Sequence, residues 1–129
     1  MALKRIILEL GTGNDLYGED YTKAAVRAVH DALHHSSITL FRSLDLDRES
    51  MQVKVRVGVQ KPELVDCDAV AAELPHGQVS VETEIGGMNL VDPDNDTVSV
   101  IATVGISAYL DLPDGKFSCL LYTSDAADE

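Results

Sequence analysis

The sequence is poor in basic residues and cysteine, and each shortage excludes a class of protein. Ten Lys and Arg residues stand against 22 Asp and Glu residues, which gives a formal net charge of −12. Because nucleic acids and anionic membranes are bound through clustered Lys and Arg, we expect neither as a partner. The two cysteines form no CxxC motif and no pairing framework. This scarcity excludes a disulfide scaffold and favours a reducing compartment, so we expect a cytoplasmic protein.

Long apolar runs are also missing. The run near the start, "RIILELG", is interrupted by Glu9 and followed by glycines instead of a small-residue cleavage site. We therefore expect neither a signal peptide nor a transmembrane span. The 129 residues are 45% hydrophobic, which suffices for a single domain with one core.

The final segment, "CLLYTSDAADE" (119–129), resembles the in-frame translation of a transposase adapter used in library preparation, a read-through found in metagenomic assemblies. We therefore expect a single α+β domain over 1–118 and a non-native tail over 119–129. Cys67 is then the only native cysteine.

Alternation of apolar and polar residues predicts four strands. The predicted strands are 3–10, 51–60, 78–87 and 97–110. Apolar residues at helical spacing predict a helix over 20–35, with Asp20 as its cap. A second helix is expected to begin at Asp66 and to end before Pro75 and Gly77. The order β-α-β-α-β-β predicts a two-layer α+β sandwich, in which a four-stranded mixed sheet carries both helices on one face.

The other face of this sheet is predicted to be open and partly apolar. In the first strand we expect Ile6, Leu8 and Leu10 to point inward. Ile7, Ile101 and Tyr109 would then lie among charged residues on the open face. Such a face suits either solvated cross-strand ion pairs or a second subunit, and we expect a homo-oligomer.

The stretch "GTGNDLYG" (11–18) connects the first strand to the first helix. A loop in this position presents backbone N–H groups and the positive end of the helix dipole, which favour an anion. The spacing of its glycines matches neither the dinucleotide-binding motif nor the P-loop. Two interpretations stay open: a ligand or subunit-contact loop, or a tight turn whose glycines take positive φ. The candidate ligand-binding residues are Gly11, Gly13, Asn14, Asp15, Tyr17 and Gly18.

From "ELGTGNDLYGEDYTKAAVRAVHDAL" through "LDLPDG", the chain resembles the Lin0512 family of conserved hypothetical proteins, whose signature is G-x-G-x-D-x-H-G. The residues that match are Gly11, Gly13, Asp15 and Gly18, whereas Tyr17 takes the place of the histidine. The resemblance implies no established activity. If that histidine were a base or a metal ligand, Tyr17 would supply neither function at neutral pH.

At the level of fold, the element order resembles the chorismate-mutase-like fold that the tubulin C-terminal domain shares. This resemblance implies the strand order 1-4-2-3 and assembly as a trimer or ring.

Two further motifs contain residue types that bind metal ions. His30 and His34 are one helical turn apart, but they share a polar stripe with Lys23 and Arg27, which is typical of a solvated helix face. The stretch "DPDND" begins like a calcium loop but lacks the required Gly and Glu, so a hairpin turn is favoured. We therefore expect no metal site, and no cofactor motif is evident.

These patterns favour a homo-oligomeric protein of unknown molecular function with a small-molecule or anion site at 11–18. One alternative is an enzyme of the hydrolase or lyase type that acts on a small polar metabolite, with Asp15 as the candidate catalytic base or metal ligand. Another is a structural or regulatory assembly protein without catalysis. A buried Asp15 in a concave site favours the enzyme, whereas an Asp15 that caps its own backbone favours the assembly protein.

Overall fold

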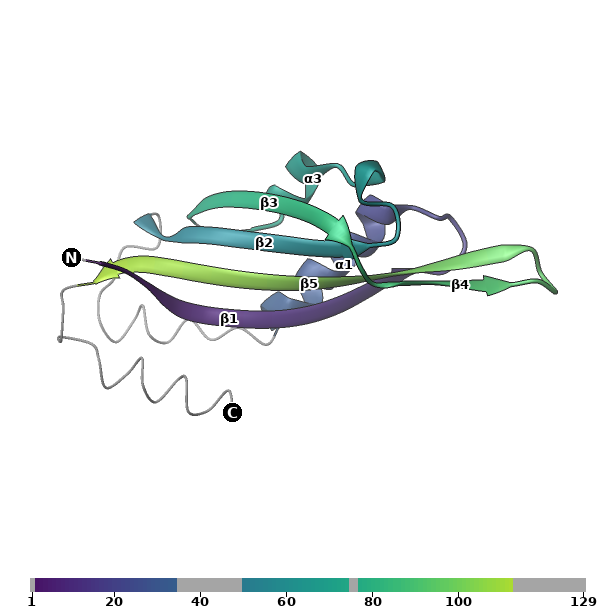
Figure 1. The fold of residues 1–129 in the computed structure, drawn as a ribbon, viewed down its shortest axis with the longest axis horizontal. Helices are drawn as coiled ribbons and strands as arrows, with labels where there is room; N and C mark the ends of the chain where they lie inside the picture. The colour runs from purple at the N-terminus through teal and green to yellow at the C-terminus, as the bar shows by residue number, and fades with distance from the viewer. Residues whose placement is uncertain (1, 35–49, 75–76, 113–129) are drawn as a thin grey trace.

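The computed structural model describes residues 2–34, 50–74 and 77–112. The predicted tail 119–129 and the helix stop at Pro75 lie outside these residues. Five strands and two α-helices make up the described part (Figure 1). In chain order, the elements are β1 (Ala2–Asp15), α1 (Tyr21–His34), β2 (Gln52–Val59), the 3-10 helix η2 (Pro62–Leu64), α3 (Cys67–Ala71), β3 (Gln78–Ile85), β4 (Met88–Asp92) and β5 (Thr97–Leu112).

All strands belong to one mixed sheet, as predicted for the α+β class. The order is β1-β5-β2-β3, in which β2 and β3 are parallel and β5 is antiparallel to both of its neighbours. If β4 is set aside, this is the order 1-4-2-3 that the fold resemblance implies. The predicted count of four strands is wrong, because β4 pairs with the first part of β5 and extends the sheet as a hairpin. Its five residues are too few to show a clear alternation.

The first strand is longer than predicted, and its pairing shifts near its start. β1 runs to Asp15, so that the first part of the stretch 11–18 is strand and not loop. The register with β5 shifts between Arg5 and Ile7. An extra residue in one strand exchanges the two faces for every residue that follows it.

This shift overturns the predicted inward residues of β1. Leu8 and Leu10 pair with Ser107 and Gly105 on the open face, and their exposed fractions are 37% and 68%. The inward positions belong to the small or polar residues Gly11, Gly13 and Asp15, all of which are buried. The side chains of Ile6 and Ile7 lie outside the described part of the chain.

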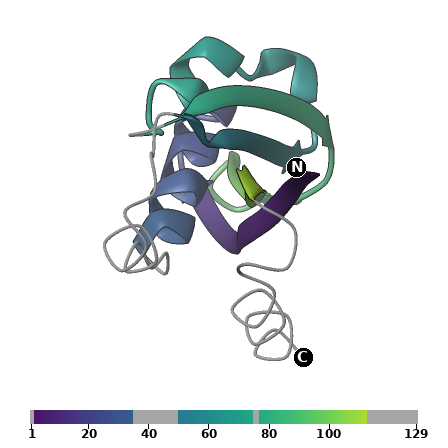
Figure 2. The same cartoon turned by 90° about the vertical axis from the view of Figure 1, so that its left-hand side faces the viewer.

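Helix α1 lies against one face of the sheet (Figure 2). Its buried side is made mainly of alanines, which allow the helix backbone to approach the sheet closely. Asp20 caps its N-terminus as predicted, because Oδ1 accepts a hydrogen bond from the N–H of Lys23 at 3.0 Å. The buried helix residues are Tyr21, Ala24, Ala25, Ala28, Val29 and Ala32, and they pack with valines of β2 and β5.

The second helix begins where it was predicted to begin, and it is short. Asp66 caps α3 by accepting hydrogen bonds from the N–H groups of Asp68 and Ala69. Val70 of this helix is fully buried in the same core that α1 contacts. None of the helices in the described ranges is long and apolar enough to cross a membrane.

Candidate functional site

The candidate site is the turn that joins β1 to α1, and the Asp15 side chain lies at its centre. Asp15 is the last residue of β1 and is only 5% exposed. Its Oδ2 atom accepts a hydrogen bond from the backbone N–H of Asp20 at 2.9 Å. Gly18 passes directly beside this carboxylate, because a Cβ atom on Gly18 would lie 2.8 Å from Oδ2. The carboxylate therefore closes the turn, and glycine leaves room for it.

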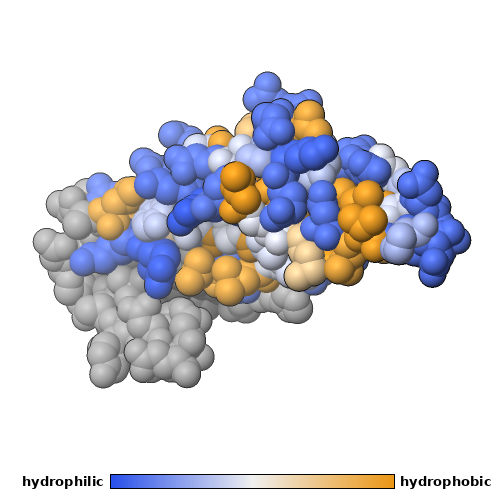
Figure 3. All heavy atoms as spheres, turned by 45° about the vertical axis from the view of Figure 1, so that its right-hand side comes forward, coloured by the Kyte–Doolittle hydropathy of each residue, from blue (hydrophilic) through white to orange (hydrophobic). Residues whose placement is uncertain are grey.

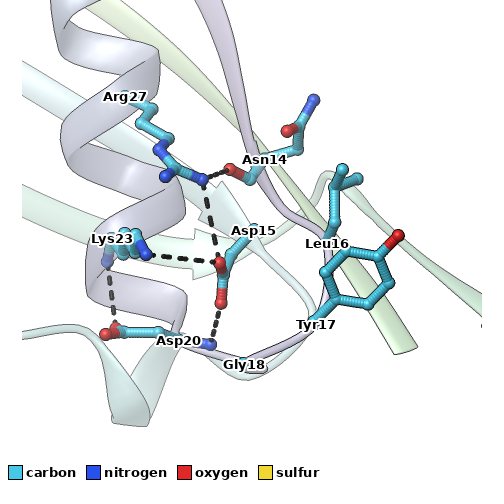
Figure 4. Close-up of a pocket in the computed structure, with 8 residues that line it drawn as sticks. All are labelled: Asn14, Asp15, Leu16, Tyr17, Gly18, Asp20, Lys23 and Arg27. Atoms are coloured by element: carbon cyan, nitrogen blue, oxygen red, sulfur yellow. Dashed lines mark hydrogen bonds and ion pairs between the residues drawn. The ribbon is translucent and has the colours of Figure 1, made fainter. Parts of the chain in front are cut away.

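Two cationic side chains of α1 face the other carboxylate oxygen (Figure 4). The Nζ atom of Lys23 lies 3.9 Å and the Nη1 atom of Arg27 lies 3.7 Å from Oδ1 of Asp15. Both distances are longer than a hydrogen bond. The Lys23 and Arg27 side chains are 51% and 46% exposed, so each keeps about half of its surface toward solvent.

The same helix face also binds the outer edge of β1. Arg27 donates from Nη1 to the carbonyl oxygen of Asn14 at 2.6 Å. One turn further along, Asp31 accepts a hydrogen bond from the N–H of Thr12 at 2.9 Å. Side chains of α1 thus satisfy two backbone groups that an edge strand otherwise leaves for another strand. Arg27 is therefore held in place by β1 as well as by Asp15.

A pocket of about 450 Å³ lies over this arrangement. Its lining includes four of the six predicted ligand-binding residues, together with three charged residues of α1 and its cap. In Figure 4 the carboxylate of Asp15 points toward Lys23 and Arg27, whereas the ring of Tyr17 points away from them. Tyr17 is 78% exposed. The lining residues are Asn14, Asp15, Leu16, Tyr17, Gly18, Asp20, Lys23 and Arg27.

The structure does not bring Gly11 and Gly13 to this pocket. Both are buried under α1, where a Cβ atom on either would overlap the helix backbone around Ala28. Among the described glycines, positive φ occurs only at Gly77 and Gly87. The interpretation that glycines of 11–18 serve positive φ is therefore wrong. Gly11 and Gly13 instead permit the close contact between strand and helix.

The chain is similar to a known protein family and to a solved structure. Residues 5–108 match the family of conserved hypothetical proteins called Lin0512. The chain belongs to this family. A crystal structure of an FtsZ-like protein of unknown function from Nostoc punctiforme PCC 73102 is similar, with 32% sequence identity and a TM-score of 0.75. The similarity covers 87% of this chain and 99% of that one. No curated protein matches the chain.

In this Lin0512 member, the surroundings of Asp15 combine both of the features that were expected to discriminate between functions. The carboxylate is buried beside a concave site, as an enzyme would require, but one oxygen is engaged in holding its own turn. Among the described residues, no three His, Cys, Asp or Glu side chains are grouped so that they could hold a metal ion. The arrangement can hold the cationic side chains of Lys23 and Arg27 at the mouth of a pocket.

The sequence pattern places Lys23 and Arg27 on a solvated stripe and does not assign them to the site. The signal that could have found them is their i, i+4 spacing in the first two turns after the glycine-containing stretch. His30, on the same stripe, lies toward α3 instead, where Nε2 is 3.3 Å from Oε2 of Glu73. His34 is exposed at the end of α1.

Proposed function

We propose that this Lin0512 protein is a homo-oligomeric binding protein that takes a small polar metabolite at the turn between β1 and α1. The observation that carries the proposal is the convergence of Lys23 and Arg27 on the buried Asp15. Their half-exposed ammonium and guanidinium groups offer charge-assisted hydrogen bonds to a carboxylate or phosphate group. Such a pair of fixed cations is notable in a chain whose net charge is −12.

The composition of the pocket narrows the chemistry of the ligand. Asp15 and Asp20 balance the charges of Lys23 and Arg27, so that the site has little excess charge to attract a simple anion. A molecule that carries an anionic group and also a hydrogen-bond donor can contact the cations with one end and a carboxylate or the Asn14 side chain with the other. We therefore favour small hydroxy or amino acids and their phosphorylated relatives as the class of ligand.

An enzyme of the hydrolase or lyase type with Asp15 as base is the second candidate. The observation that favours it is the burial of this carboxylate beside the pocket. Against it, Oδ2 is hydrogen-bonded to the N–H of Asp20, and Oδ1 faces the cationic groups of Lys23 and Arg27. A base that accepts a proton loses its charge, so that Lys23 and Arg27 would have to rearrange around a neutral carboxyl group. Binding requires no such rearrangement.

The test is a thermal-shift experiment with inorganic phosphate and a panel of small hydroxy and amino acids. We expect at least one probe to raise the unfolding temperature of the wild-type protein, because a ligand that binds only the folded state stabilises it. Lys23→Met should abolish the ligand-induced shift. The matched control is Lys61→Met, which removes an exposed lysine that does not line the pocket. A shift that survives in Lys23→Met, or no shift with any probe, would contradict the proposal.

The assembly part of the proposal is supported by the open face of the sheet. On β1, Leu3, Leu8 and Leu10 are 47%, 37% and 68% exposed. Contiguous exposure of large apolar residues is uncommon in monomers and typical of interaction surfaces. The trimer or ring that the fold resemblance implies stays a prediction, which sizing of the purified protein tests. A structural or regulatory assembly protein without a ligand would show the same oligomer but no response to any probe.

A further inference from the structure

We infer that the open face of the sheet is a self-complementary interface, in which Leu10 of one chain packs into a groove above Gly105 of a second copy. This inference rests on the homo-oligomer of the proposed function and defines its contact. It is independent of the ligand pocket, since none of the residues named for the groove lines that pocket.

The first observation is a glycine that the chain itself does not require. Gly105 lies in the middle of β5, between Leu10 on β1 and Arg56 on β2. A Cβ atom there would meet only the Cδ2 atom of Leu10, at an ordinary contact distance of 3.7 Å. Its φ is not positive either, in contrast to Gly77 and Gly87. Glycine weakens a strand interior and often marks a place where another molecule approaches closely.

The second observation is the groove that this glycine creates. A cavity of about 390 Å³ lies on the open face, and Gly58 and Gly105 contribute to its floor. Leu10 and Ile85 form apolar walls and are 68% and 75% exposed. Arg56 and Glu84 form a third wall, and they hold each other in place because the Nε atom of Arg56 donates to Oε1 of Glu84 at 2.8 Å. The groove thus has the size and the lining to accept a leucine side chain.

The positions of Leu10 and Gly105 identify a second copy as the occupant. The two residues are direct neighbours across β1 and β5, so that a projecting leucine stands next to the hollow. A twofold axis between them places each leucine over the glycine of the other chain. Because the projection and the hollow share one face, the contact is isologous and closes on itself. An assembly in which every chain pairs through this face contains an even number of chains, so this contact predicts a dimer or an even-numbered ring and not a trimer.

The charges on this face agree with a second copy of an acidic chain. Over the four strands β1, β5, β2 and β3, the open face carries equal numbers of basic and acidic residues, although the whole chain has a net charge of −12. Two copies repel each other least where the acidic excess is absent. The basic residues are Arg5, Lys54 and Arg56, and the acidic residues are Glu82, Glu84 and Asp111.

Further apolar residues surround the proposed contact. Met88 and Leu90 of β4 lie opposite Ile101 and Ser99 on the same face, and each is 52% exposed. Figure 3 shows hydrophobic residues gathered along the lower middle and right of this side of the molecule, with hydrophilic residues above them. The apolar area therefore continues beyond the groove along β1 and the β4–β5 hairpin, where it would add to the buried surface.

The test compares the assembly of two variants by sedimentation velocity and light scattering. Gly105→Leu fills the groove and Leu10→Ser removes the projecting side chain. We expect each to raise the dissociation constant of the assembly at least tenfold. Leu64→Ser is the matched control, because Leu64 is 56% exposed on η2 and does not line the groove. It should assemble like the wild-type protein.

Several outcomes would overturn the inference. They are a monomeric wild type at micromolar concentration, an assembly with an odd number of chains, and an assembly that Leu10→Ser leaves unchanged. Leu10→Ser decides the matter even if Gly105→Leu fails to fold, since Leu10 is largely exposed. The ligand proposal fails separately: Leu10→Ser should keep its thermal response to the probes, and Lys23→Met should keep its assembly.

Discussion

The backbone N–H of Asp20 donates to the Oδ2 atom of Asp15 at 2.9 Å, and this hydrogen bond connects the end of β1 to the cap of α1. Asp20 in turn accepts a hydrogen bond from the N–H of Lys23. The residue that caps the helix is thus held by the residue that ends the strand. The positions of Lys23 and Arg27 over the pocket follow from this sequence of contacts.

We predict that Asp15→Ala lowers the free energy of unfolding by about 1–3 kcal/mol, because the substitution leaves the N–H of Asp20 without its partner. It also removes the charge that faces Lys23 and Arg27. Urea unfolding measures the change. Asp94→Ala is the control, since Asp94 is an exposed turn residue and its loss should change stability by less than about 0.5 kcal/mol. Equal stabilities of the two variants would show that Asp15 does not hold the turn.

We predict that Gly13→Ala destabilises the protein by about 3 kcal/mol. A Cβ atom on Gly13 would lie 2.5 Å from the carbonyl oxygen of Ala24 and against the N–H of Ala28, so that α1 must move away from the sheet. Thermal and urea unfolding measure the loss.

Gly105→Ala provides the comparison for this prediction, because its Cβ atom would make only an ordinary contact with Cδ2 of Leu10 at 3.7 Å and the substitution reduces the entropy of the unfolded chain. We expect it to be neutral or slightly stabilising. Equal effects of the two substitutions would mean that the close packing of β1 on α1 does not explain Gly13.

The sequence predicts most of this fold because its patterns are local. The spacing of the valines in β2 and of the alanines in α1 indicates which residues are buried. Asp20 and Asp66 mark the starts of the helices, because each accepts a hydrogen bond from an N–H group within a few residues. The register shift in β1 is different. Nothing in "LKRIILEL" signals the extra residue between Arg5 and Ile7, because the shift is decided by pairing with β5, about a hundred residues later.

The position of the candidate pocket could be predicted from the sequence, but the full set of residues that line it could not. Glycines and Asp15 between a strand and a helix indicate the turn over which the pocket lies. Whether each glycine faces a ligand or a helix depends on the face it occupies, and the shifted register sends Gly11 and Gly13 toward α1. Lys23 and Arg27 looked like ordinary solvated residues, since their distance to Asp15 depends on how α1 packs on β1.

We predict that Asn95→Ala raises the pKa of Asp92. The side chain of Asn95 donates to Oδ2 of Asp92 at 2.7 Å, and this bond is the main reason that the Asp92 pKa lies below its ordinary value, although desolvation opposes the shift and the N–H groups of Asp94 and Asn95 add to it. A lowered pKa stabilises the folded hairpin above about pH 3.9, the value in an unfolded chain, and this contribution is lost as the pH falls through the folded pKa.

The measurement is an NMR titration of the Asp92 carboxyl carbon in the wild type and in Asn95→Ala. The distant Asn14→Ala variant serves as the control and should leave the Asp92 titration unchanged. Identical titration curves for Asp92 in the wild type and in Asn95→Ala would refute the assigned cause.

We predict that Tyr21→Phe destabilises the protein more than the double variant Tyr21→Phe/Asn89→Leu does. Asn89 on β4 donates from Nδ2 to the hydroxyl oxygen of Tyr21 at 2.7 Å, and the Tyr21 side chain is almost fully buried. The Oδ1 atom of Asn89 is buried and has no hydrogen-bond partner in the described part of the chain. Phenylalanine at position 21 would leave both ends of this amide unsatisfied, at a cost of about 1–3 kcal/mol.

The double variant replaces both polar partners by apolar groups, which removes the unsatisfied amide and should recover much of that loss. A double-mutant cycle from urea unfolding, completed with Asn89→Leu alone, measures the coupling between the two residues, which we expect to be about 0.5–3 kcal/mol. Additive effects would mean that the bond between Tyr21 and Asn89 does not connect the start of α1 to the β4–β5 hairpin. A measurable coupling would show that this hairpin, whose strand β4 the predicted four-stranded sheet did not include, helps to position the helix that carries Lys23 and Arg27.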